Sequence, residues 1–254
     1  MQVSLITCTY NSEKTIKDCC LSIYSQSCTN LEHIILDNNS HDQTLAIAKK
    51  YKIKSQRIFQ QKSIGIYGAL NEGLRKASGE VVGILHSDDE FIENNIIEDV
   101  RKIFLDKKID VLFSNLFYTK KKDTKKIIRK WKSSLLPGIQ SNLEIENKIN
   151  KGWMPPHTTL FFKKKLLDKV GVYDEKLKIS SDYDFMIRLL KTKNIKIFFL
   201  DRFTINMRVG GTSNKNIKNI FNKILEDLSI MKKNKMNTVK SIFYKNISKI
   251  SQFF

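Results

Sequence analysis

The acidic residues Asp37, Asp88 and Asp89 are the first candidates for chemistry, because each follows a short apolar run typical of a β-strand. In an open α/β sheet, ligands bind beyond the carboxyl ends of the strands. A single Asp there is usually a turn former or helix cap, whereas the adjacent pair Asp88 and Asp89 repel each other and call for a compensating cation. Mg²⁺ or Mn²⁺ held by one or two carboxylates keeps positions open for phosphate oxygens. The pair therefore predicts a divalent-metal site, with a capping role as the alternative.

A second group of polar residues lies in the later part of the chain. Asp182 and Asp184 open a predicted helix, where the helix dipole alone also favours acids. His157 is a candidate for orienting an acceptor or a phosphate, with a structural role as the alternative, and Arg208 is a candidate for neutralising phosphate charge. The sequence has no G-x-G-x-x-G, G-x-x-x-x-G-K-[ST] or G-x-S-x-G motif. Rossmann dinucleotide binding, P-loop hydrolysis and a serine-hydrolase elbow therefore lose support.

The elements that must position these residues alternate between strand and helix over the first two-thirds of the chain. Strands are predicted at 3–7, 33–37, near 58, 81–85 and 110–118, and helices end near 24, 51, 77 and 105. The third of these helices is expected to close with Gly79 as its C-cap. This order predicts an α/β fold with a mostly parallel sheet flanked by helices.

After residue 119 the pattern becomes less regular. Strands are expected at Thr158–Phe162 and Ile195–Leu200, with a short helix from Asp182 between them. Residues 207–209 lead into the glycine pair Gly210-Gly211, which is expected to form either a mobile loop or a plain turn. No low-complexity linker divides the halves, so residues 1–214 are predicted to form one catalytic domain.

Residues 215–254 are predicted to be a basic, amphipathic, helical extension. Apolar residues from Ile217 to Met231 repeat at helical spacing, which predicts a helix docked on its own domain. A second pattern from Val239 to Phe254 has lysines between its apolar residues. For this second helix we hypothesise an in-plane position on an anionic membrane surface.

The positive charge is concentrated in two places. The chain has 254 residues and a formal net charge of +19. Residues 120–132 contain eight Lys or Arg and one Asp, and residues 215–254 contain nine Lys and two acids, so each stretch carries +7. The first stretch lies between two strand-like runs, which favours a solvated hairpin tip over a nucleic-acid surface.

The cysteines and the hydropathy of the chain indicate its cellular compartment. The four cysteines have no zinc-binding spacing and are expected to be thiols that pack as small hydrophobes. The longest apolar runs fall far short of the roughly 18 residues of a membrane-spanning helix. We expect a cytoplasmic protein, with peripheral attachment to the inner membrane face through the tail as a hypothesis.

An ordered set of motifs extends over roughly residues 1–214. It comprises Thr7-Cys8-Thr9-Tyr10-Asn11, Asp37 to Thr44, Gly65-Ile66-Tyr67 with Ala69 to Gly73, Ala77 to Glu80, Ser87-Asp88-Asp89, Pro156-His157, Ser181 to Asp184, and Met207 to Asn214. Taken together, these motifs resemble family 2 glycosyltransferases with the GT-A fold, of the kind that build bacterial surface polysaccharides.

This resemblance implies an inverting transfer from a nucleotide-diphosphate sugar, most often a UDP-sugar, to a hydroxyl of a glycan or lipid-linked acceptor. It implies that Thr7, Thr9 and Asn11 line the nucleotide pocket and that Asp37 meets the base. Asp88 would contact the ribose or the metal, and Asp89 would bind the metal that bridges the diphosphate. Asp182 would be the general base, with Asp184 as the competing candidate. Such a displacement needs one base for the acceptor hydroxyl and a Lewis acid for the leaving diphosphate.

Two other functions remain open at this point. A sugar-phosphate nucleotidyltransferase shares the metal and the α/β nucleotide site, but it would require a basic, glycine-rich phosphate loop, and residues 7–12 contain no Gly, Lys or Arg. A basic nucleic-acid-binding module would show steep salt dependence, but the sequence lacks an aromatic-basic platform for RNA. We therefore expect no specific nucleic-acid partner.

Overall fold

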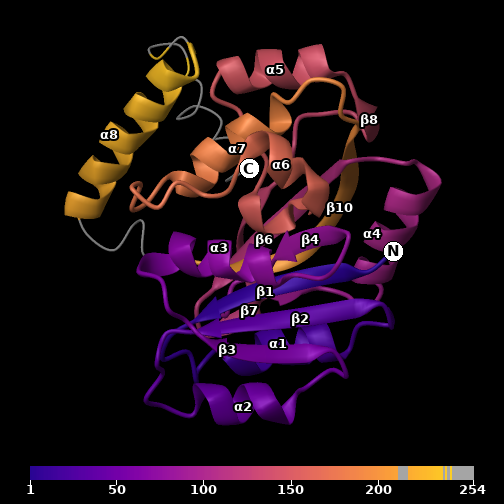
Figure 1. Ribbon diagram of the computed structural model, residues 1–254, viewed down its shortest axis with the longest axis vertical. Helices are drawn as coiled ribbons and strands as arrows, with labels where there is room; N and C mark the ends of the chain where they lie inside the picture. Colours follow the sequence, from indigo (N-terminus) through magenta and orange to yellow (C-terminus); the bar gives the residue numbers. More distant parts are fainter. Residues whose placement is uncertain (211–216, 237, 239–240, 242–254) are drawn as a thin grey trace.

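A mixed β-sheet forms the centre of the molecule in a computed structural model, which describes residues 1–210, 217–236, 238 and 241 (Figure 1). The strands are β1 Val3–Thr9, β2 Leu31–Asp37, β3 Gln56–Gln60, β4 Val81–Ile84, β5 Glu90–Phe91, β6 Val111–Lys120, β7 Asp123–Trp131, β8 Gly138–Gln140, β9 Phe161–Lys163 and β10 Ile197–Arg208. The helices are α1 Ile16–Tyr24, α2 Thr44–Lys50, α3 Gly65–Lys76, α4 Ile96–Asp106, α5 Asn142–Asn150, α6 Leu167–Val170, α7 Ser181–Leu190 and α8 Ile217–Lys233. Two 3₁₀ turns lie at His157–Thr159 and Lys164–Leu166.

The strand order within the described residues is β3-β2-β1-β4-β9-β6-β10-β5, with β7 paired to β6 and β8 paired to β10. Strands β1 to β4 pair in parallel. Strand β9 is antiparallel to both β4 and β6, so β6 and its parallel partner β10 run in the same direction as β1 to β4. The carboxyl ends of six strands consequently meet at one edge, and the prediction of an α/β fold with a mostly parallel sheet is confirmed.

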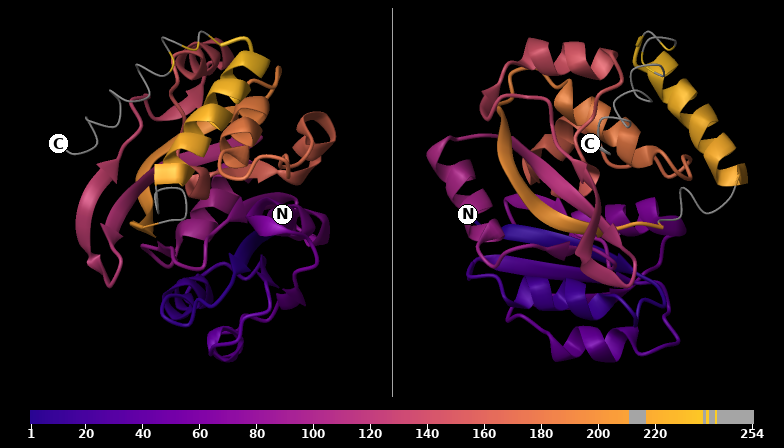
Figure 2. Two further views of the ribbon diagram at one scale, coloured as in Figure 1. Left: turned by 90° about the vertical axis from the view of Figure 1, so that its left-hand side faces the viewer. Right: turned by 180° about the vertical axis from the view of Figure 1, so that it is seen from behind.

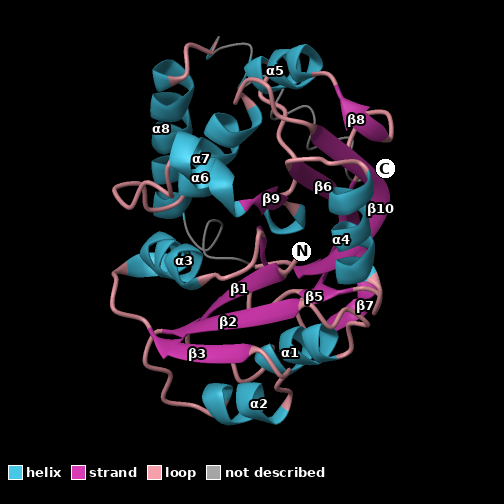
Figure 3. Cartoon of the chain, turned by 45° about the vertical axis from the view of Figure 1, so that its right-hand side comes forward, coloured by secondary structure: helices cyan, strands magenta, loops and turns pink. Residues whose placement is uncertain are grey.

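Alternate residues of the central strands face two separate hydrophobic cores. In β4, Val82 and Ile84 pack into one core with side chains of α3 and α7, whereas Val81 packs into the other with side chains of α1 and α4. Figure 3 shows these helices on the two faces of the sheet. Burial on both faces explains why β4 is an uninterrupted run of apolar residues and glycine.

The predicted C-cap at Gly79 is wrong. Helix α3 ends at Lys76, and Ala77 is its cap residue with extended backbone dihedrals. Gly79 is instead needed for a close approach, because a Cβ atom there would lie 2.6 Å from Ser4 Oγ and 2.8 Å from the Ser4 backbone nitrogen. The glycine therefore lets the chain pass against β1 before β4 begins.

Two strand boundaries in the later part of the chain also differ from prediction. Residues 157–159 form a 3₁₀ turn rather than the start of a strand, and β9 covers only Phe161–Lys163. Strand β10 continues past the predicted end at Leu200 to Arg208, with two register irregularities between Leu200 and Ile205. These irregularities interrupt the apolar alternation that would have revealed the longer strand.

The basic stretch at residues 120–132 belongs to the hairpin of β6 and β7. The two strands pair antiparallel, and the lysines along β7 are exposed. The predicted solvated hairpin is confirmed.

Helix α8 packs on the body of the protein but not through the whole predicted apolar stripe. Ile230 and Met231 are buried in the same core as α7. Phe221 and Leu225, which the periodicity places on the packed face, are 61% and 49% exposed. Figure 2 shows α8 beside α7 in both views. The division at residue 214 stays a prediction, and the predicted second tail helix lies outside the described residues except at position 241.

All four cysteines are free thiols, and Cys19, Cys20 and Cys28 are buried, in agreement with the prediction. Within the described ranges, no helix has both the length and the hydropathy to cross a bilayer.

Candidate active site

The candidate site lies where β1, β2 and β4 end at one edge of the sheet. Thr9, the last residue of β1, is in register with Asp37, the last residue of β2. On the other side of β1, the Leu85 backbone nitrogen donates a hydrogen bond to the Ile6 carbonyl. This bond extends the pairing of β4 with β1 by one residue, and the loop His86–Glu90 follows directly after it. The topology thus brings Asp37 and the Asp88-Asp89 pair to the two sides of β1.

Asp37 borders a hollow of about 360 Å³, a volume in the range of small-molecule sites. Its carboxylate accepts from the Ser40 backbone nitrogen at 2.9 Å and from the Ser40 hydroxyl at 2.6 Å. The hollow is lined by Asp37, Asn39, Ser40, His41, Leu45, Ile58, Phe59 and Gln60. Neither Asp89 nor Asp182 belongs to this lining, so Asp37 occupies a subsite of its own at the edge.

Asn11 shapes the loop around this hollow. Its backbone adopts a φ of 46°, in the left-handed region that Asn tolerates. Its side-chain oxygen accepts from the His41 backbone nitrogen at 2.9 Å, and its own backbone nitrogen donates to the Ser40 hydroxyl. Asn11 therefore links the end of β1 to the turn that follows β2.

The two threonines of β1 differ in how their hydroxyls are used. Thr7 is fully buried, donates to the Leu85 carbonyl at 2.8 Å and lies 3.0 Å from His33 Nε2. Its hydroxyl therefore joins β1 to its two neighbouring strands. The Thr9 hydroxyl is buried without a hydrogen-bond partner and remains available to a ligand at the strand end.

Asp89 presents a buried carboxylate that is only half satisfied. The side chain is 1% exposed, Oδ1 accepts from the Arg208 backbone nitrogen at 3.3 Å, and Oδ2 has no hydrogen-bond partner. Burial, reinforced by the neighbouring Asp88, raises the pKa of Asp89 well above its ordinary value. A cation at Oδ2 would relieve both effects.

The described residues contain no cluster of three or more His, Cys, Asp or Glu side chains suited to a metal. Asp88 and Asp89 nevertheless fit an ion of the Mg²⁺ or Mn²⁺ type, which needs only one or two carboxylates when a phosphorylated ligand supplies further oxygens. The unpartnered Asp89 Oδ2 is the observation that supports this fit.

Arg208 forms hydrogen bonds that hold the acidic loop in place. Its guanidinium is buried, donates to the Asp88 carbonyl at 2.6 Å and forms an ion pair with Asp18 of α1. The geometry gives Arg208 a role in fixing the Asp88-Asp89 loop, whereas the sequence suggested direct contact with the acceptor or the diphosphate.

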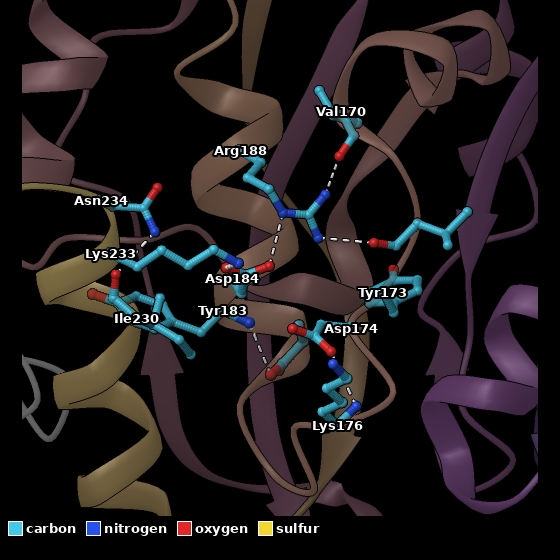
Figure 4. A network of polar contacts seen from close by, with 12 residues as sticks. Val170, Tyr173, Asp174, Lys176, Tyr183, Asp184, Arg188, Ile230, Lys233 and Asn234 are labelled. Carbon is cyan, nitrogen blue, oxygen red and sulfur yellow. Dashed lines mark hydrogen bonds and ion pairs between the residues drawn. The ribbon is translucent and has the colours of Figure 1, made fainter.

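Asp182 and Asp184 open α7 but face different surroundings. Asp184 is 1% exposed and pairs with Arg188 at 2.7 Å, while Lys233 of α8 lies 3.6 Å from its other oxygen (Figure 4). Asp182 is only partly buried and has no ion pair among the described residues. Of the two, Asp182 is the more accessible carboxylate.

The side chain that holds Asp182 is Tyr67, a residue to which the sequence analysis gave no role. Gly65, with a φ of 75°, starts α3 and brings the Tyr67 hydroxyl to 3.2 Å from Asp182 Oδ1. The same oxygen accepts from the Tyr183 backbone nitrogen at 2.9 Å. Both contacts reach Oδ1, which leaves Oδ2 as the oxygen that can act on a substrate. The signal in the sequence was the tyrosine of Gly65-Ile66-Tyr67 within the resembling motifs.

His157 lies between the acidic loop and the base candidate. Its ring centroid is 6.1 Å from that of His86, and its Nε2 lies 2.8 Å from the Tyr173 hydroxyl. Burial lowers the pKa of His157 to about 4, with Asp182 opposing that shift and His86 adding to it. The neutral imidazole can therefore hydrogen-bond a ligand but does not supply positive charge at neutral pH.

The loops on the two sides of β1 are in direct contact. The Ser12 hydroxyl, in the loop after β1, lies 3.1 Å from the hydroxyl of Ser87 in the acidic loop. Together with the His86–His157 contact, this places the Asp88-Asp89 loop between the hollow at Asp37 and the carboxylate of Asp182. The arrangement offers a ligand subsite, a cation subsite and a base along one sheet edge.

Comparisons with known proteins give a consistent match. The family model described as "Glycosyl transferase family 2" matches residues 4–171. An uncharacterized glycosyltransferase of Methanocaldococcus jannaschii is 29% identical over 217 residues, which cover 84% of this chain and 72% of that protein.

Two solved structures share the fold. Residues 1–349 of Staphylococcus aureus TarS, in complex with UDP-GlcNAc, match with a TM-score of 0.71 and 23% identity, over 91% of this chain and 67% of that one. A mannosyltransferase from Pyrobaculum calidifontis, in complex with GDP-Man and Mn²⁺, matches with a TM-score of 0.62 and 16% identity, over 92% of this chain and 64% of that one. The chain thus spans between 64% and 72% of the length of these three proteins.

Proposed function

Since the chain belongs to glycosyl transferase family 2, we propose that it transfers a sugar, with inversion, from a UDP-sugar to a hydroxyl of a glycan or lipid-linked acceptor. The observation that carries the proposal is Asp182, a partly accessible carboxylate held by Tyr67 at the same sheet edge as the Asp88-Asp89 pair. Family membership favours sugar transfer over the nucleotidyltransferase and nucleic-acid alternatives.

The donor would bind from β2 towards β4. The hollow beside Asp37 would take the nucleobase, with Asn11 holding the His41 turn that lines it, Thr9 at the end of β1, and Asp88 near the ribose. Thr7 is left out of the proposed contacts because its hydroxyl is used within the sheet. The nucleotide-sugar complexes of TarS and of the Pyrobaculum mannosyltransferase support this type of donor.

Asp89, with Asp88 beside it, would hold Mg²⁺ or Mn²⁺ through the unpartnered Oδ2. When bound, the ion supplies charge neutralisation for a diphosphate leaving group. Arg208 keeps the two carboxylates in place through the Asp88 carbonyl and the Asp89 side chain. The Mn²⁺ complex of the Pyrobaculum mannosyltransferase supports a metal in a protein of this fold.

Asp182 would act as the general base. Tyr67 and the Tyr183 backbone nitrogen fix Oδ1, so that Oδ2 can accept the proton of the acceptor hydroxyl as that oxygen attacks the anomeric carbon. His157, neutral at physiological pH, would orient the acceptor through a hydrogen bond. A single displacement of this kind inverts the anomeric configuration.

The test is a panel of nucleotide-sugars with Mn²⁺. Donor binding is measured by calorimetry, and transfer to alkyl glycosides is measured by release of the nucleoside diphosphate, with the anomeric configuration of the product read by NMR. The proposal expects one donor to bind and to yield an inverted product. Absence of binding for every nucleotide-sugar, or a product with retained configuration, contradicts it.

We further propose that the protein works as a peripheral protein at the inner face of a membrane. The support is the exposed pair Ile220 and Phe221 on α8, together with the exposed lysines of the β6–β7 hairpin. Cosedimentation with anionic vesicles, compared with zwitterionic ones, tests this contact, and equal recovery with both contradicts it.

A further inference from the structure

A carboxylate of α8 binds the loop that leads into α7. Glu226 accepts hydrogen bonds from three consecutive backbone nitrogens, at 2.9 Å from Lys178, 2.9 Å from Ile179 and 2.8 Å from Ser180. Hydrogen bonds to an ionised acceptor are stronger than those between neutral groups. One side chain from a distant segment therefore fixes three successive peptide groups.

The loop 178–180 is directly joined to the proposed base. Ser181 is the first residue of α7 and Asp182 the second, so the direction in which the loop enters the helix sets the position of the Asp182 carboxylate. The cap residue Ser180 makes no side-chain capping hydrogen bond. Glu226 binds the backbone nitrogens just before this helix, the last of them Ser180, from 46 residues away.

The same loop is held from its other side by Tyr67. The Tyr67 hydroxyl lies 2.6 Å from the Ile179 carbonyl and 3.2 Å from Asp182 Oδ1. The peptide groups of Ile179 are thus bound through N–H by Glu226 and through C=O by Tyr67. Because a phenol has one proton, Tyr67 divides its donation between the loop and the base.

Helix α8 is a firm support for Glu226. Ile230 and Met231, one turn further along, are buried in the core shared with α7, and Lys233 lies 3.6 Å from Asp184. The packing of α8 therefore rests on residues other than Glu226, and removal of this carboxylate should leave the helix in place.

We propose that Glu226 is a positioning residue for the transfer reaction: it holds the loop 178–180, and through that loop it orients the Asp182 carboxylate towards the acceptor. The inference rests on the proposed role of Asp182 as general base. It extends the functional unit beyond residue 214, because a residue of α8 then contributes to the reaction.

The experiment compares Glu226→Ala and Glu226→Gln in the full chain, with Lys232→Ala as the control, since Lys232 is exposed on the same helix. Donor affinity is measured by calorimetry with UDP-GlcNAc and Mn²⁺, and transfer by UDP release with an alkyl glycoside. Misplacement of a catalytic group by about 1 Å can lower the rate about a hundredfold. We expect Glu226→Ala to lower kcat about ten- to a hundredfold with unchanged donor affinity, Glu226→Gln to retain more activity because it keeps an acceptor oxygen, and the control to match the wild type.

Hydrogen exchange and a double variant separate positioning from general loss of structure. In Glu226→Ala, the amides of residues 178–180 should exchange faster while those of the β1–β4 core do not change. Because coupled residues have non-additive effects, Glu226→Ala should cause little further loss in the Asp182→Asn background. Where the Ala variant does not fold, Glu226→Gln alone decides between the outcomes.

Two failures are distinguishable. Wild-type kcat in the Glu226 variants, or a fully additive loss in the double variant, overturns the inference while an impaired Asp182→Asn variant still supports the base. Wild-type transfer by Asp182→Asn overturns the proposed base itself and the inference with it.

Discussion

The hydroxyl of Tyr67 on α3 lies 3.2 Å from Oδ1 of Asp182 on α7, so residues 115 positions apart meet in one hydrogen-bonded pair. Helix α3 packs against β1 and β2, and β2 ends at Asp37 beside the hollow, whereas α7 carries the proposed base. This contact therefore ties the proposed donor side of the site to the proposed acceptor side.

Tyr67→Phe is predicted to lower kcat while donor binding is retained. The change removes a hydrogen bond to a carboxylate, worth roughly 1.5–3 kcal/mol, and leaves the Ile179 carbonyl without this donor. We expect a loss of about tenfold or more in kcat, measured by UDP release alongside calorimetry of the donor. Tyr24→Phe, an exposed tyrosine on α1, is the control, and an unaffected kcat in Tyr67→Phe would show that this contact does not serve the reaction.

The two acids of α7 are predicted to fail in different ways when they are changed to Asn. Asp182→Asn should lower transfer by about a hundredfold or more, because general-base catalysis contributes roughly 10²–10⁴, and should leave the free energy of unfolding nearly unchanged. Asp184→Asn should destabilise the fold by about 3 kcal/mol, because it leaves Arg188 without its buried partner. Urea unfolding and kcat measured on both variants check the assignment, which the opposite pattern would reverse.

Asp89→Asn is predicted to lower donor affinity while the thermal stability is kept or raised. The variant should lose about tenfold or more of the donor affinity measured with Mn²⁺, and EDTA should have the same effect on the wild type. The buried carboxylate has no partner at Oδ2, so the neutral amide should unfold at the same temperature or a higher one. Asp106→Asn at the exposed end of α4 is the control, and retained Mn²⁺ dependence in Asp89→Asn would remove this residue from the metal site.

The free energy of unfolding is predicted to fall at acid pH because of His33, which is fully buried in β2. Burial lowers the pKa of His33 from 6.5 to about 4, so the unfolded chain takes up a proton at a higher pH than the folded protein does. The stability is then fully present above pH 6.5 and is lost as the pH falls towards 4, by about 3 kcal/mol at most. His33→Gln should flatten the dependence of the unfolding free energy on pH between 6.5 and 4, whereas His41→Gln, an exposed position, should not. Equal pH dependence in the wild type and His33→Gln would disprove this contribution.

The strand and helix pattern of the first half was predictable because the burial of β1, β2 and β4 on both faces leaves a direct mark on the sequence. The position of Asp37 and of Asp88-Asp89 at one edge followed from the same pattern, since parallel strands end together. Gly79 was misassigned because a glycine needed for close packing looks the same in sequence as one that ends a helix.

The contacts around Asp182 could not be predicted in the same way. Tyr67 and Glu226 lie 115 and 44 positions from it, and periodicity reports only which face of a helix is apolar. On α8 the periodicity was misleading, because Phe221 and Leu225 are exposed while Asp227 is buried on the packed face. Hydrogen bonds between distant segments depend on tertiary packing and leave no repeating pattern.

The three hydrogen bonds of Glu226 also have a consequence for the order of events during synthesis. Residues 178–180 are synthesised before Glu226, so the loop 178–180 is at first without its partner, while all residues of β1 to β4 have already been added. A chain that ended between the two segments would contain β1 to β4 but would lack the side chain that anchors the loop beside Asp182.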